Sequence, residues 1–146
     1  MSRARVYVSF DIEHDRELYE RLRAESGGAG FSVSGGSEYL SATDVWDASV
    51  RRRIREADEV IVICGEHSGS STGMSSELRI AREERTPYFL LWGRRETMCT
   101  KPSGASSGDG IYMWTREVVR DQVAIGLRRA RALARSVRSD PGIGST

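Results

Sequence analysis

Apolar and polar residues alternate between strand-like and helix-like patterns along the whole chain. Short runs rich in β-branched and aromatic residues predict strands. Apolar residues spaced three and four apart predict amphipathic helices between those strands. The predicted strands are Arg5–Phe10, Phe31–Val33, Glu59–Cys64, Pro87–Trp92 and Ile111–Trp114. The predicted helices are Asp15–Ser26 with Asp15 as its cap, Asp44–Ala57, Met74–Arg85 and Arg116–Val137.

Two of the predicted strands are nearly all apolar instead of alternating. Glu59–Cys64 reads Glu-Val-Ile-Val-Ile-Cys, and Pro87–Trp92 is apolar throughout. A strand without alternation is typical of the centre of a parallel sheet, where both faces are buried. Because strands and helices alternate along the chain, we expect an α/β fold with a roughly five-stranded parallel sheet between helices. The expected strand order is the flavodoxin-like 2-1-3-4-5.

Glycine, serine and polar residues separate these elements. Gly27–Gly30 follows a predicted helix and is interpreted as its C-terminal cap. Gly35–Thr43 is predicted to be a polar loop. Arg94–Gly110 has a serine- and glycine-rich composition that predicts a mobile loop with little buried apolar area. We expect residues 1–138 to form one domain and residues 139–146 to be a disordered tail.

Composition and charge exclude several classes of protein. The longest apolar runs have five residues, too few for a membrane span. Two cysteines and two histidines provide neither a disulfide framework nor a metal-ligand cluster, so no metal is expected. A net charge of +1 makes nucleic acid an unlikely partner. No signal-peptide pattern precedes the first strand, and we therefore expect a cytoplasmic protein without a membrane partner.

The expected topology by itself, without any motif, predicts where a binding site lies. In an open parallel sheet, ligands bind beyond the carboxyl ends of the strands where the winding reverses, here between strands one and three. The loops at that point nominate Ser9, Phe10, Asp11, His67 and Glu77. Neither a dinucleotide-binding glycine fingerprint nor a Walker pattern occurs at the first strand–helix turn.

Four segments, in this order and spacing, resemble TIR domains, and specifically the short bacterial TIR-like proteins of Thoeris-type anti-phage defence. They are Val6–Phe10, Ala57–Cys64, Ser75–Leu78 and Arg85–Leu91. The similarity spans roughly residues 4 to 135. One departure is Gly73, where many active members of the family have a tryptophan four residues before the glutamate.

The resemblance implies an enzyme that cleaves the nicotinamide–ribose bond of NAD. Glu77 would be the catalytic carboxylate, with NAD as substrate and no other cofactor. Ser9, Phe10 and Asp11 would line the NAD-binding pocket, together with Ser76 beside the glutamate. Trp46 would offer a stacking surface, although a core position is the alternative. The product would be a cyclic or modified ADP-ribose signal that acts on a separate effector protein, and activation would involve self-association into a homo-oligomer.

Other interpretations of the same residues remain open. Glu77 could simply favour the positive end of a helix, and the serines before it could cap that helix. His67 could be a solvated loop residue, and Cys64 a small core residue. At the level of the whole chain, the alternatives are a non-catalytic TIR interaction module and a nucleoside deoxyribosyltransferase-like enzyme.

Overall fold

The structure is a computed structural model that describes residues 3–38 and 43–139. Its strands are β1 (Ala4–Ser9), β2 (Phe31–Gly36), β3 (Glu59–Cys64), β4 (Tyr88–Trp92) and β5 (Ile111–Tyr112). Its α-helices are α1 (Arg16–Glu25), α2 (Thr43–Glu56), α3 (Thr72–Glu83) and α4 (Arg116–Ser139), and the short 3-10 helices are η1 (Ser26–Ala29) and η2 (Ser68–Ser70).

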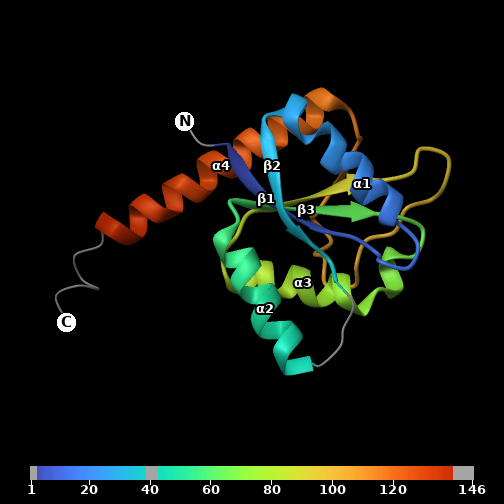
Figure 1. Ribbon diagram of the computed structural model, residues 1–146, viewed down its shortest axis with the longest axis horizontal. Coiled ribbons are helices and arrows are strands. Elements are labelled where there is room, and N and C mark those ends of the chain that lie inside the picture. The colour runs from blue at the N-terminus through green and yellow to red at the C-terminus, as the bar shows by residue number, and fades with distance from the viewer. Residues whose placement is uncertain (1–2, 39–42, 140–146) are drawn as a thin grey trace.

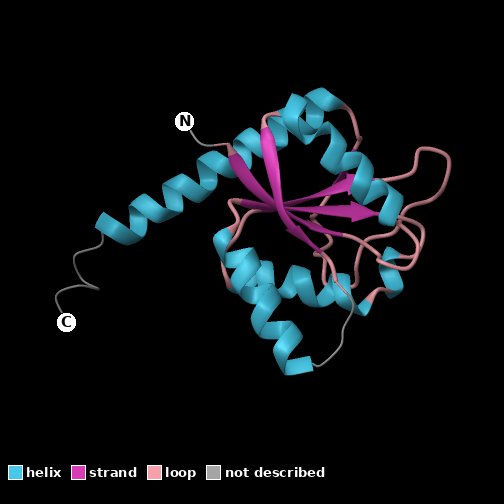
Figure 2. Ribbon diagram, viewed as in Figure 1, coloured by secondary structure: helices cyan, strands magenta, loops and turns pink. Residues whose placement is uncertain are grey.

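The five strands form one parallel sheet in the order β2-β1-β3-β4-β5. This confirms the predicted fold class and strand order. Helices cover both faces of the sheet, as Figure 2 shows. On one face the sheet packs against α1 and α4, and on the other against α2 and α3 (Figure 1).

Alternation along β1 assigns its side chains to the two faces. Val6 and Val8 belong to the core beneath α1 and α4, whereas Tyr7 belongs to the core beneath α2 and α3. Residues two apart in a strand share a face. Ser9 therefore follows Tyr7 onto the α2–α3 side, at the carboxyl end of the strand. All six residues of β3 are buried, as its unbroken apolar run predicted.

The structure changes some predicted boundaries. β2 continues to Gly36, into the segment predicted as a polar loop, and residues 39–42 of that loop lie outside the described residues. α4 continues to Ser139, while the rest of the predicted tail also lies outside them. Among the described residues, no helix is long and apolar enough to cross a membrane.

The long segment between β4 and β5 is packed onto the domain. The Thr100 backbone N–H donates to the Gly65 carbonyl at 2.9 Å. Cys99 and Pro102 are both buried. Cys99 belongs to the core beneath α2 and α3. The segment is therefore anchored to the domain at these points, despite the serine- and glycine-rich composition around them.

Candidate functional site

A buried carboxylate lies at the carboxyl end of β1. Glu77 projects from α3 and has no exposed surface. The Tyr7 hydroxyl donates to its Oε2 at 2.5 Å, and the Ser9 hydroxyl donates to its Oε1 at 2.8 Å. Because Tyr7 and Ser9 are two residues apart in β1, they present their hydroxyls to the same face and hold the two oxygens of one carboxylate.

A third hydroxyl comes from Ser37, the residue that directly follows β2. The Ser37 Oγ lies 2.8 Å from Oε1 and 2.9 Å from Oε2 of Glu77. The same Oγ accepts a hydrogen bond from the Phe10 backbone N–H at 2.9 Å. Ser37 thus connects the ends of β1 and β2 to the glutamate of α3.

Burial and these hydroxyls act on the ionisation of Glu77 in opposite directions. Desolvation raises its pKa to about 7, although the hydrogen bonds from Tyr7, Ser9 and Ser37 each favour the ionised form. The pKa of Tyr7 is raised as well, first by burial and then by the neighbouring carboxylate. A carboxyl group that titrates near neutral pH can serve as an anion or as a proton donor in catalysis.

The interpretation of Glu77 as a first-turn residue is wrong. α3 begins at Thr72, and its cap is Ser71, whose Oγ accepts from the Met74 backbone N–H at 3.2 Å. Ser75 and Ser76 are therefore not caps, and Glu77 lies in the second turn. Since the helix dipole acts mainly within the first turn, burial decides the charge of this group.

A cavity of about 370 Å³ opens beside Glu77. Phe10, Asp11 and Trp46 line it, as predicted for a pocket at this point of the sheet. Phe10 stacks on Tyr19 with ring centroids 4.6 Å apart. Trp46 also belongs to the core beneath α2, which confirms the core position. Its use as a stacking surface for NAD stays a prediction. The remaining lining comes from the loops after β1, β2 and β3 and from the start of α3: Ile12, Glu13, His14, Ser37, Glu38, His67, Ser70, Ser71, Thr72 and Gly73.

Two of the predicted NAD-binding residues lie outside this lining. Ser9 is fully buried beneath the cavity and reaches it only through Glu77. Ser76 lines a different cavity, with Arg79 and Ser103. The prediction that Ser76 shares the pocket is wrong, because consecutive residues of a helix point about 100° apart.

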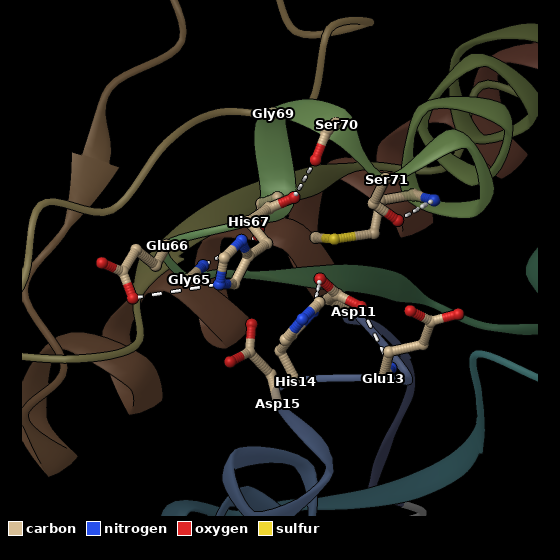
Figure 3. A network of polar contacts seen from close by, with 12 residues as sticks. Asp11, Glu13, His14, Asp15, Gly65, Glu66, His67, Gly69, Ser70 and Ser71 are labelled. Atoms are coloured by element: carbon tan, nitrogen blue, oxygen red, sulfur yellow. Dashed lines mark hydrogen bonds and ion pairs between the residues drawn. The ribbon is translucent and has the colours of Figure 1, made fainter.

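Three residues of the site were not predicted from the sequence: Tyr7, Ser37 and His14. Tyr7 could have been found, since it shares a strand face with Ser9 in the sequence Tyr-Val-Ser. His14 lies one residue before the predicted helix cap, and its ring stacks on that of His67, with centroids 3.9 Å apart (Figure 3). Ser37 gave no signal, because only the pairing of β2 with β1 brings it to the carboxylate.

Metal binding has no support within residues 3–38 and 43–139. No group of three or more histidine, cysteine, aspartate and glutamate side chains lies close enough together there to hold a metal ion. Both cysteines are buried and unpaired. The chemistry available at this site is therefore that of carboxylates, hydroxyls and imidazoles.

Comparison with known proteins supports the fold. No family model matches the chain, and no curated protein matches it. Among solved structures, the chain is similar to one described as the crystal structure of a prokaryotic SEFIR domain. The TM-score is 0.51 at 17% identity, over 87% of this chain and 91% of that chain. The fold is TIR-like. At this identity the similarity establishes the fold alone.

Proposed function

We propose that this TIR-like chain is an NAD-consuming enzyme that cleaves the nicotinamide–ribose bond, with Glu77 as its essential carboxylate. One observation carries the proposal. A fully buried carboxyl group with a pKa near 7 is held by three hydroxyls beside a cavity, at the point where the sheet reverses its winding. A group that is desolvated and also given specific partners is typical of a catalytic site.

The chemistry requires an anion at this position. When the bond breaks, nicotinamide leaves with the bonding electron pair and positive charge develops on the ribose. An ionised Glu77 would stabilise that charge more in the transition state than in the ground state. Hydrolysis is completed when water adds to the anomeric carbon and releases a proton. Cyclisation is completed when a nucleophilic atom elsewhere in the same molecule attacks that carbon instead.

Substrate would have to displace a protein group from Glu77. Both carboxylate oxygens are occupied, and Ser37 contacts both of them. Tyr7 and Ser9 belong to a central strand, whereas Ser37 follows the edge strand β2 and lines the cavity. We therefore assign Ser37 as the hydroxyl that a ribose hydroxyl replaces when NAD binds.

The proposal also includes a biological role for the product of the reaction. The product would be a cyclic or modified ADP-ribose that signals to a separate effector in anti-phage defence of the Thoeris type. Self-association would complete or activate the site. A non-catalytic interaction module is the second candidate, and it is favoured by one observation: Glu77 has no exposed surface and its hydrogen bonds are all made within the protein.

The test is Glu77→Gln, which keeps the size of the side chain and removes its charge. Nicotinamide release at saturating NAD should fall by about 10²- to 10³-fold. The matched control is Glu20→Gln, on the exposed surface of α1, which should keep the parental rate. Circular dichroism and the thermal midpoint of each variant verify that the fold is retained.

The two candidates give different results. A Glu77→Gln variant with near-parental turnover would refute the catalytic assignment. A parent protein that releases no nicotinamide at any protein concentration would favour the interaction module.

A further inference from the structure

The only two histidines of the chain meet at the cavity beside Glu77. His14 comes from the loop after β1, and His67 from the loop after β3. Their rings are stacked, with centroids 3.9 Å apart and planes 28° apart. Figure 3 shows the two rings facing each other between these loops. Both side chains are about half exposed, at 46% and 48%, so a ligand in the cavity can reach them.

No other cavity-lining side chain among the described residues can carry a positive charge. The described lining contains no arginine or lysine, and it contains four carboxyl groups besides the two imidazoles: Asp11, Glu13, Glu38 and Glu77. An anionic ligand entering the cavity would therefore depend on the histidine pair. The hydroxyl group of Thr72 lies in the same lining and can donate to the same anion.

Asp11 fixes the orientation of one imidazole. His14 Nδ1 lies 2.9 Å from Asp11 Oδ2. This hydrogen bond is the main cause of a raised His14 pKa, to which Glu13 and Asp15 also contribute. Within the described chain, His14 Nε2 has no hydrogen-bond partner, which leaves this nitrogen for a ligand.

Charged groups from both loops act on the pair. On the His14 side, Arg94 donates to the His14 carbonyl at 3.0 Å and to Asp15 at 2.9 Å. On the facing loop, Glu66 lies 4.0 Å from His67 Nε2. Asp11, Glu13 and Asp15 favour an imidazolium at His14. A second one would be stacked directly on the first, and like charges at that distance repel each other.

We propose that the His14–His67 pair is a phosphate subsite, which takes up a proton as it binds the diphosphate of a dinucleotide. A phosphate beside both rings offsets their repulsion, so the second imidazole becomes protonated when the anion binds. The choice of a dinucleotide rests on the proposed function, whereas phosphate binding by the pair does not. The assignment makes the two histidines binding residues and gives them no part in breaking the glycosidic bond.

The experiment follows the imidazole NMR signals of the full chain. With only two histidines, the spectrum has two sets of ring signals, and His14→Gln and His67→Gln assign them. The ligands are inorganic pyrophosphate, inorganic phosphate and nicotinamide riboside, each at constant ionic strength. NAD is added to Glu77→Gln, so that turnover does not remove it.

Pyrophosphate and NAD should shift both imidazole signals to saturation, and nicotinamide riboside, which lacks phosphate, should shift neither. Uptake of one proton makes binding up to about tenfold tighter for each pH unit lowered through the titration of the pair. Each single substitution should weaken pyrophosphate binding by about tenfold.

Pyrophosphate that leaves both signals unchanged, or that binds equally at all pH values, would overturn the phosphate subsite. Saturation by inorganic phosphate but not by NAD would overturn the dinucleotide assignment. Because these readouts do not involve turnover, they also separate the two proposals. A protein that does not cleave NAD but binds pyrophosphate at the histidine pair would contradict only the proposed function. A protein that cleaves NAD but whose imidazole signals do not shift with pyrophosphate would contradict only this inference.

Discussion

A buried carboxyl group at the amino end of the central strand makes the stability of the protein depend on pH. The cavity lies at the opposite, carboxyl ends of the strands. Glu59 opens β3 and is 2% exposed. Its carboxyl group occupies a notch in α4 at Gly126, where any side chain larger than hydrogen would collide with it. Its Oε1 is buried without a hydrogen-bond partner. Desolvation raises the pKa of Glu59 to about 9, against a smaller opposing effect of Arg129.

The size of this pH effect follows from the difference in the pKa of Glu59 between the folded and unfolded states. Between about pH 5 and about pH 9, the unfolded chain has Glu59 ionised while the folded chain keeps it protonated, so folding takes up a proton. Stability from this group is fully present below the ordinary glutamate pKa and is lost as pH rises toward the folded value. The loss is about 1.4 kcal/mol per pH unit well below the folded pKa, or about 2 kcal/mol between pH 7 and pH 9, since the group is half ionised at the upper end.

The assay is urea unfolding of the parent and of Glu59→Gln between pH 7 and pH 9. Glu77 also has a raised pKa, of about 7, so it is half ionised at the start of this interval and adds a smaller loss of stability that the parent and the variant share. The parent should lose about 2 kcal/mol of unfolding free energy from Glu59 across it. The Gln variant should show a much smaller slope, because an amide does not titrate. Its stability at pH 7 can be lower than that of the parent, since an amide N–H buried without a partner costs about 1–3 kcal/mol.

The control is Glu20→Gln, an exposed glutamate of α1, which should keep the parental slope. If Glu59→Gln retained the parental slope, the argument would be refuted, because the carboxyl group would then be ionised in the folded protein. Comparing slopes across pH within each variant removes the effect of the substitution on packing.

Two further predictions concern the proposed activity. NAD cleavage should increase as pH rises through about 7, where Glu77 ionises, and Tyr7→Phe should displace this increase to higher pH, because it removes a hydrogen bond that favours the carboxylate. A pH–rate profile of the variant whose midpoint is unchanged or lower would contradict this role of Tyr7. Self-association predicts that the specific activity rises steeply with protein concentration, and a specific activity that stays constant over the whole range would count against it.

The architecture of this protein was predictable from local patterns. Apolar residues at spacings of three and four located the helices, and the nearly all-apolar segment Glu59–Cys64 identified a central strand with the observed bounds. These patterns are readable because helix and strand periodicities are properties of a few neighbouring residues. The strand order then followed from general rules of chain connection, and it located the cavity between the ends of β1 and β3.

The contents of the site depended on contacts between distant residues. The sequence nominated Glu77 as the catalytic carboxylate, with a helix-end position as the alternative, and it placed Ser76 in the same pocket. Only the packing of α3 on β1 shows that Glu77 is buried at a pKa near 7 and that Ser76 faces elsewhere.

The polar groups around the cavity also come together only in the tertiary structure. Ser37 is 40 residues from Glu77 in the chain, and the two histidines that stack on each other belong to different loops. Short-range patterns report which face of an element is apolar. They do not report which polar side chains meet when loops converge, and in this protein the ionisation and hydrogen bonding of the site are set by that convergence.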